Sequence, residues 1–161
     1  FPLQWKTRSV VPIYKNKDSK ADSNNYRPIT LTCALAKFFE NVINHSSLKY
    51  LNHHDLITNS QSGFRKNHGT ITQLVNLIEK ITKAVADGKS VNTVFLDISR
   101  AFDRVWHDKL ISKMYELGIR GNLLKCIKKF LTDRKIRVTW EGNASKWYSI
   151  NAGVPQGSIL A

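Results

Sequence analysis

The stretch that most constrains this fold is residues 91–98, where most side chains are apolar. Short β-branched and aromatic runs bounded by turn residues are typical of strands buried on both faces of a sheet. We therefore expect a central strand here, with a single carboxylate, Asp97, near its end. A second aspartate, Asp103, follows six residues after Asp97. Near the end of the chain, a Gly-Val-Pro-Gln-Gly turn at 153–157 opens an expected helix.

A strand that ends on a carboxylate is suited to holding a hard divalent cation, and a glycine-rich turn with a glutamine lets a nucleotide approach the backbone closely. Together they suggest two-metal nucleotidyl transfer. One aspartate cannot hold two ions, so the carbonyl of Ile98 is a further candidate and other carboxylates must lie elsewhere. The alternative is that Asp97 only ends a strand or caps a helix. Asp103 is expected to bond nearby backbone or pair with a base such as Arg104.

The rest of the chain alternates between helical and strand patterns. A strand is expected at 5–14, with Pro12 near its edge, before a polar loop at 15–27. Apolar spacing predicts helices at 33–51, 70–86, 107–117 and 122–132. Alternation predicts a strand at 136–140 that returns through a turn at 141–143 to a partner at 147–150. Helices between strands predict an α/β (α+β) fold.

The formal net charge is +13. Residues 1–90 carry 13 Lys and Arg against 6 acids, and residues 91–161 carry 12 against 6, so the excess is not confined to a tail. A basic surface on a folded body favours polyanions such as nucleic acid. One alternative is that the protein is merely soluble and cationic. The other is that its basic surface binds an anionic membrane. The basic residues of 120–137 either face nucleic acid or form a solvated helix face.

The 161 residues, 42% of them hydrophobic, suffice for one core or two small ones. No apolar run approaches the roughly 18–20 residues of a membrane span, and the start lacks a signal-peptide pattern. Cys33 and Cys126 lie far apart without metal-ligand spacing, which predicts buried, reduced thiols and an intracellular protein. The two ends look like cuts, so we expect part of a longer polypeptide.

Several motifs occur in a fixed order: RSVVPIYK, NYRPITL, QSGFRKNHGT, then FLDISRAFDRVWH with KLISKMYELGIRGNLLKCIKKFLTDRKIRV, and GVPQGSIL. In this order they resemble the reverse transcriptase domain of non-LTR retrotransposons, most of all LINE elements of the jockey and chicken-repeat-one type. The resemblance covers essentially the whole chain. A group II intron maturase shares the Gln-x-Gly-Phe-Arg and Ala-Phe-Asp patterns, but the helical segment 109–137 argues against it.

The resemblance implies roles for individual residues. Asp97, with Ile98, would be the first metal-binding and catalytic aspartate. Phe102 would be the aromatic steric gate that selects deoxynucleotides, unless it is a core aromatic. The turn of Pro155, Gln156 and Gly157 would pack against the incoming nucleotide. Three cations would meet the triphosphate, unless they are solvated loop cations: Arg8, Lys15 and Arg27. A further motif would lie near the template strand: Gln61, Phe64 and Arg65. In this motif Phe64 could equally be a core anchor.

The resemblance also implies an architecture. It is the right-hand polymerase fold, with fingers at 1–90 and a partial palm at 91–161 whose sheet carries Asp97. The chain contains no Asp-Asp pair, so the second metal-binding motif of the family is missing. The implied activity is an RNA-directed DNA polymerase, a nucleotidyltransferase of transposable elements that uses Mg²⁺ or Mn²⁺, an RNA template, a DNA primer and deoxynucleoside triphosphates. It would act in the nucleus and cytoplasm of a eukaryotic host.

Alone, this piece is expected to lack activity. The alternative to a polymerase fragment is an inactive, basic remnant that only binds nucleic acid. The oligomeric state has no signature in the sequence.

Overall fold

A computed structural model describes all 161 residues and shows a mixed α and β chain that divides into two compact units. The first unit joins Phe1–Tyr50 with Ser99–Ala161, and the second is Leu51–Ile98. No helix is both long and apolar enough to cross a membrane. The mixed composition of helices and strands confirms the expected fold class.

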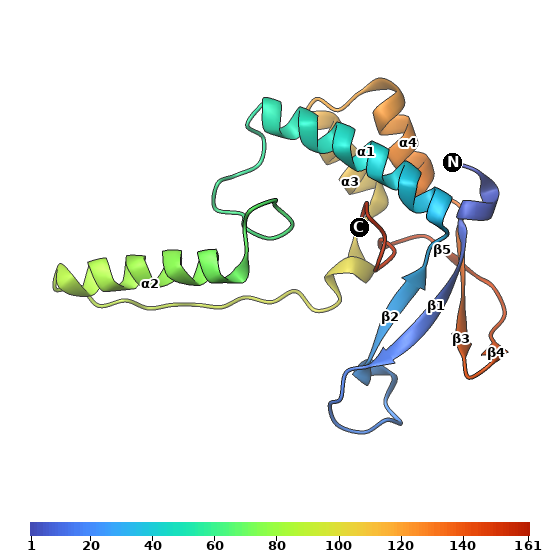
Figure 1. Ribbon diagram of the computed structural model, residues 1–161, viewed down its shortest axis with the longest axis horizontal. Coiled ribbons are helices and arrows are strands. Elements are labelled where there is room, and N and C mark those ends of the chain that lie inside the picture. Colours follow the sequence, from blue (N-terminus) through green and yellow to red (C-terminus); the bar gives the residue numbers. More distant parts are fainter. The chain divides into compact units, whose positions relative to one another are not determined.

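The first unit is built on one sheet in the order β2-β1-β3-β4, with β5 also paired to β3 (Figure 1). β1 pairs antiparallel with β2 and parallel with β3, which comes from the other end of the chain. The predicted hairpin is confirmed, because β3 pairs antiparallel with both β4 and β5. The strands are β1 (Thr7–Tyr14), β2 (Tyr26–Leu31), β3 (Arg134–Trp140), β4 (Asn143–Ala144) and β5 (Tyr148–Ile150).

Sequence reasoning missed β2, whose first residues were expected to end a loop. Pro28 obscured it, since proline cannot donate to a ladder and is confined to edge strands or bulges. β2 is an edge strand, where this loss is tolerated. Pro12 lies opposite Pro28 and beyond the stretch of β1, Thr7 to Val10, that pairs with β3. Its missing N–H therefore interrupts no bond to β3, in line with the expected edge position.

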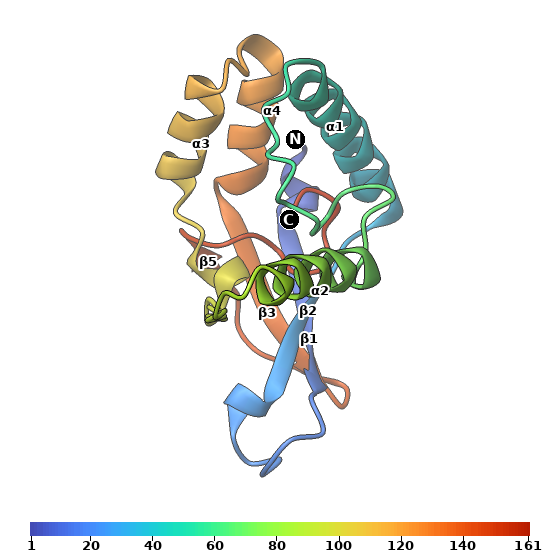
Figure 2. The same cartoon turned by 90° about the vertical axis from the view of Figure 1, so that its left-hand side faces the viewer.

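Three of the predicted helices gather at one end of this sheet: α1 (Ala34–His53), α3 (His107–Glu116) and α4 (Gly121–Leu131) (Figure 2). Their apolar faces meet in a core of Ile43 from α1 and Ile127, Phe130 and Leu131 from α4. Phe1 closes this core with an edge-on contact to Phe39 at 5.4 Å between ring centroids. Short 3-10 turns occur at Leu3–Trp5, Ser23–Asn25 and Ala101–Arg104.

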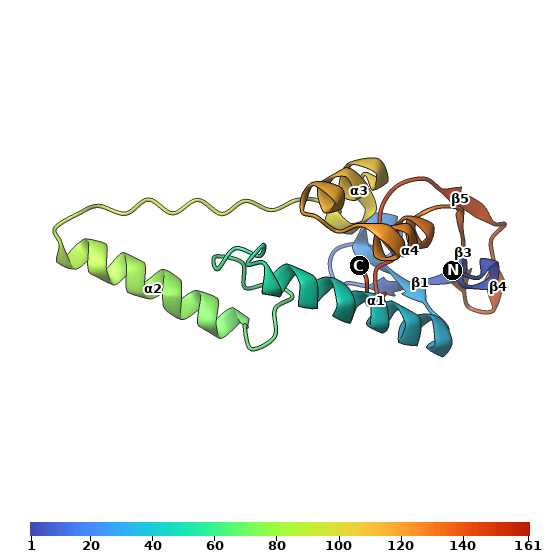
Figure 3. The same cartoon turned by 90° about the horizontal axis from the view of Figure 1, so that it is seen from above.

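The second unit holds the fourth predicted helix, α2 (Thr70–Ala86), followed by an extended stretch that runs back in the opposite direction (Figure 3). None of the residues of α2 is buried, although its apolar residues share one face as predicted. The expected buried strand at 91–98 is wrong in this structure. The stretch has no strand assignment, and Phe95 and Leu96 are 82% and 92% exposed.

The reason is the lack of a pairing partner. A strand is stable only when its N–H and C=O groups bond to a neighbour, and no strand of this chain pairs with residues 91–98. The sheet of the first unit consequently does not carry Asp97, contrary to the expected palm.

Two smaller expectations are also wrong. The segment after Gly157 forms turns rather than a helix, and the side chain of Glu40 accepts the N–H of Ile159 there. Cys33 is exposed rather than buried, because it lies just before α1, where its sulfur accepts the N–H of Ala36. Both cysteines are free thiols, as expected.

Candidate functional site

The Gly-Val-Pro-Gln-Gly turn at 153–157 is held by backbone hydrogen bonds from two distant segments. Val154 N–H donates to the carbonyl of Phe102 at 2.8 Å, and Gly153 N–H donates to that of Val105 at 2.8 Å. At the other end of the turn, Thr30 N–H on β2 donates to the carbonyl of Gln156 at 2.9 Å. Three of the sequence motifs therefore meet at this turn.

Gly153 permits the closest of these approaches. Its φ is +75°, and a Cβ built there would lie 2.7 Å from the carbonyl oxygen of Asp103 and 2.9 Å from that of Phe102. Real Cβ atoms do not come so near to backbone, so only glycine allows the two segments to touch. The segment that carries Phe102 and the turn that carries Gln156 are in backbone contact for this reason.

The carbonyl of Gly153 is bound by two buried cationic or basic side chains that sequence reasoning did not single out for this site. The Nε2 of His107 lies 2.7 Å from this oxygen, and a guanidinium nitrogen of Arg134 also donates to it. Since a carbonyl only accepts, His107 Nε2 is the donor, and its 3.4 Å approach to Arg134 is not a hydrogen bond. No sequence signal distinguished His107 from a helix-start residue.

Arg134 is the first residue of β3 and is 4% exposed. Burial, and then the nearby positive charge of Arg8, lower the pKa of Arg134 to about 10. This value is still well above neutral pH, so the side chain stays charged. Its Nε donates to the carbonyl of Leu131 at 3.1 Å, and its other bonds go to carbonyls of the turn. Arg134 therefore ties the start of β3 to the 153–157 turn.

Arg8 lies beside it but is held differently from the expectation. It was expected to meet a triphosphate, yet it is 4% exposed and its Nη2 lies 2.8 Å from Oε1 of Glu40. Its Nε also donates to the carbonyl of Trp5 at 3.0 Å. Glu40, which was missed, occupies the inner stripe of α1 with Ala36 and Ile43. An acid at such a position is the signal that could have revealed it.

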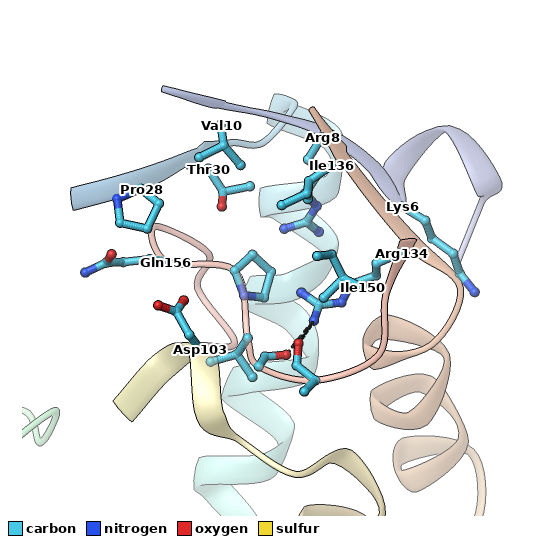
Figure 4. A pocket seen from close by; sticks show the side chains of 14 residues that line it. Lys6, Arg8, Val10, Pro28, Thr30, Asp103, Arg134, Ile136, Ile150 and Gln156 are labelled. Atoms are coloured by element: carbon cyan, nitrogen blue, oxygen red, sulfur yellow. Dashed lines mark hydrogen bonds between the residues drawn. The ribbon is translucent and has the colours of Figure 1, made fainter. Parts of the chain in front are cut away.

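Arg8, Arg134 and the Gly-Val-Pro-Gln-Gly turn line a pocket of about 310 Å³ on one face of the sheet. Gln156 and Asp103 lie on one side of it, and Arg134 and Lys6 on the other (Figure 4). Asp103 makes no ion pair with Arg104, contrary to one of its expected roles, and instead lines the pocket. The lining is mostly apolar between these polar ends, from Val10, Pro28, Ile136, Ile150, Val154 and Pro155.

The remaining predicted residues of the first unit lie away from this pocket. Lys15 is exposed and its Nζ donates to the carbonyl of Asn24 at 2.7 Å. Arg27 is exposed, and its neighbour Pro28 lines the pocket. Because side chains alternate along a strand, Arg27 projects from the opposite face of the sheet.

The other predicted residues belong to the second unit. Arg65 donates to the carbonyl of Thr58 at 3.1 Å, and Gln61 to that of Gly63 at 3.4 Å. Phe64 is 88% exposed with a φ of +59°, so the alternative that it is a core anchor is wrong. Asp97 and Ile98 are exposed at the end of the extended stretch.

The carboxylate of Asp97 and the carbonyl of Ile98 offer the oxygen atoms that Mg²⁺ prefers. They do not make up a site alone, since no group of three or more His, Cys, Asp or Glu side chains lies together in the chain. The residues present therefore fit a divalent cation in kind but not in number.

The structure brings together the Ala-Phe-Asp segment and the Pro-Gln-Gly turn, two of the motifs that carry the family resemblance. The chain belongs to the reverse transcriptase (RNA-dependent DNA polymerase) family, whose pattern matches residues 14–161. It is 36% identical over 160 residues to a probable RNA-directed DNA polymerase from transposon BS of Drosophila melanogaster. It is 37% identical over 160 residues to the RNA-directed DNA polymerase from mobile element jockey of the same organism.

Each comparison covers 99% of this chain but only 18% and 17% of those relatives. The Pol polyprotein of the type-1 retrotransposable element R2 from Popillia japonica is 27% identical over 161 residues, which covers 22% of its length. The chain thus spans about a fifth of the relatives it matches.

Proposed function

We propose that this chain is the fingers (residues 1–90) and the first part of the palm (residues 91–161) of a right-hand polymerase that copies RNA into DNA in a non-LTR retrotransposon. The relatives are named RNA-directed DNA polymerases, which supports this activity for the polypeptide to which the chain would contribute. Its substrates would be an RNA template, a DNA primer and deoxynucleoside triphosphates, with Mg²⁺ or Mn²⁺.

One observation carries the proposal: the backbone bond of 2.8 Å between Val154 and Phe102. It joins the segment with the proposed steric-gate aromatic to the turn with Gln156. A nucleotide bound there would have its sugar against the Phe102 ring, and its base pair against Gln156 and Gly157. Gly157 has a φ of +99° and no side chain to keep a base pair away from the backbone.

Metal binding is proposed for Asp97 with the carbonyl of Ile98. When bound, the cations would stabilise charge on the reacting phosphate oxygens. The proposal includes further carboxylates from a segment with an Asp-Asp pair, which this chain does not contain. The chain itself would contribute binding and orientation. It would supply an aromatic wall for the sugar, a turn for the base pair, and positively charged side chains around them.

Contacts to the template are proposed for Gln61, Phe64 and Arg65. Contacts to the triphosphate are proposed for Lys15 and Arg27, although both lie away from the pocket and Arg27 projects from the opposite face of the sheet. Support comes from exposure, since Arg27 is exposed on its strand and Phe64 is 88% exposed. An aromatic ring at the surface can stack on a base. Arg8 is retained in this set only as a prediction, because Glu40 already binds its guanidinium.

A second candidate is a nucleic-acid-binding module without activity. The incomplete set of metal ligands favours it for the isolated chain. Primer extension on an RNA template separates the two. The isolated chain should bind template–primer without extending it, whereas a polypeptide that continues through the Asp-Asp segment should extend it. Extension by the isolated chain would refute the division into a partial palm, and a continued, folded polypeptide that binds but never extends would refute the polymerase.

A further inference from the structure

Glu40 is the one acidic residue in the buried set, with a side chain that is 0% exposed. Both of its oxygens are bound. Oε1 accepts from Arg8 Nη2 at 2.8 Å, while Oε2 accepts from Ser158 Oγ at 2.6 Å and from Ile159 N–H at 3.0 Å. A buried carboxylate is very unfavourable unless it is paired and hydrogen-bonded, and this one is both.

The bonds of Oε2 distinguish Glu40 from an ordinary core ion pair. Such a pair would need only Arg8, but both donors to Oε2 come from the residues directly after the 153–157 turn. The carbonyl of Gln156, on the near side, is bound by Thr30 N–H. The backbone that carries the Gln156 side chain is therefore fixed immediately before and after Gly157, which lacks a Cβ and could otherwise adopt other backbone conformations.

We infer that Glu40 is a positioning residue for the Gln156 turn. Its carboxylate clamps Ser158 and Ile159, and Arg8 holds the carboxylate in place as a buried counter-ion. The role of this turn in nucleotide binding rests on the proposed function, but the clamp itself does not. Glu40 touches no substrate; it acts by keeping the backbone of residues 156–159 in one conformation.

Ser158→Ala tests the clamp in the complete 161-residue chain, because it removes one donor while the Arg8–Glu40 pair stays intact. Ser46→Ala is the matched control. Ser46 lies on the exposed side of α1, the helix that carries Glu40, and donates to the carbonyl of Val42. Amide hydrogen exchange should become at least about tenfold faster at residues 156–159 in Ser158→Ala, as expected when a bond to a buried charge is lost.

Amides of α4 near Phe130 should keep their rates in Ser158→Ala, and Ser46→Ala should leave all of these rates unchanged. Equal acceleration throughout the first unit would show a purely structural contribution and overturn the inference. So would unchanged exchange at residues 156–159.

Replacing the charges together adds a rescue. Glu40→Gln alone leaves Arg8 buried without its counter-ion, and it should accelerate exchange at 156–159 more than Ser158→Ala does or unfold the unit. Glu40→Gln combined with Arg8→Gln keeps an acceptor for Ser158 and removes the unpaired charge. The double variant should recover slow exchange at least in part. Exchange no slower than in Glu40→Gln alone would contradict the assigned geometry.

A binding assay separates this inference from the proposed function. The probe is a deoxynucleoside triphosphate with Mg²⁺ and an RNA–DNA template–primer. Ser158→Ala should weaken its affinity several-fold, and Ser46→Ala should not. Absence of binding by the unsubstituted chain would count against the proposed nucleotide site, while the exchange data would still decide whether Glu40 is a clamp. An unaltered affinity despite faster exchange would overturn the positioning role.

Discussion

Phe102 and Gly153 have different roles in one contact at the residue scale. Phe102 supplies the proposed wall for the sugar, and Gly153 supplies the space that lets the turn reach that segment. The bond from Val154 N–H to the Phe102 carbonyl depends on this space. Selectivity and stability can therefore be separated by substituting one residue or the other.

In an active, continued polypeptide, Phe102→Ala should relax sugar selection. A 2′-hydroxyl would overlap the aromatic ring, and deleting a clash removes discrimination without adding a new attraction. The kcat/KM ratio for a deoxynucleotide over its matched ribonucleotide should fall about tenfold or more. Were both activities to drop together with an unchanged ratio, Phe102 would be a packing residue instead.

Gly153→Ala should destabilise the first unit by at least about 2 kcal/mol more than Gly142→Ala, because an added Cβ would force packed backbone apart. The two glycines have similar φ values, +75° and +80°, but only at Gly153 would an added Cβ lie within 3 Å of backbone atoms. The measurement is chemical denaturation of both variants. Equal losses of stability would mean that the two segments are not in contact.

At the scale of elements, helix α4 and the run at 91–98 both carry apolar side chains but differ in burial. Leu131 is 1% exposed in the core, while Leu96 is 92% exposed in the extended stretch. Both positions are leucines in apolar segments, so only the structure distinguishes them. If the proposed palm forms, the exposed apolar run at 91–98 is the segment that would have to pair with another strand.

Leu131→Ala should lower the free energy of unfolding by about 2–5 kcal/mol, the usual loss for a buried leucine. Leu96→Ala should change it by less than about 0.5 kcal/mol, as is common at exposed positions. Thermal or urea unfolding of the isolated chain measures both. A large loss from Leu96→Ala would show that residues 91–98 are packed in solution.

Helical periodicity was sufficient to predict α1, α2, α3 and α4, and alternation was sufficient for the β3 hairpin. These signals are local, so a sequence records them. The prediction of a strand at 91–98 was wrong because a strand also needs a neighbouring strand to pair with, and no local pattern reveals whether one is present. β2 was missed for a related reason, since only its pairing with β1 compensates for Pro28.

The same division holds for the site. The motifs marked the segments of Phe102 and Gln156, which the structure brings into backbone contact. The structural roles of Glu40, His107 and Arg134 were missed. Their importance comes from burial and from bonds across more than a hundred residues in the case of Glu40 to Ser158. Arg8 matches the motif position of a phosphate-binding cation, but its guanidinium is paired with the buried carboxylate of Glu40.

At the scale of the whole molecule, the net charge of +13 predicts that any binding to nucleic acid depends strongly on salt. Binding of the isolated chain to RNA–DNA duplex should weaken as salt rises, because cationic side chains release counterions from phosphates. The logarithm of affinity should fall by roughly 0.7–0.9 per phosphate contact for each decade of salt. A titration with flat affinity would remove the electrostatic part of the account.

The central claim is that Asp97 supplies a catalytic oxygen for RNA-templated DNA synthesis, and one comparison tests it most directly. In a polypeptide that continues through an Asp-Asp segment, primer extension is measured for the unsubstituted protein, Asp97→Asn and Asp103→Asn, with folding checked by circular dichroism. An amide cannot replace an anionic ligand, so Asp97→Asn should lose about two decades of rate or more. Asp103→Asn should retain most of the rate, since no ion pair of the Asp103 carboxylate is lost. A folded Asp97→Asn that extends primers at the unsubstituted rate would contradict the account.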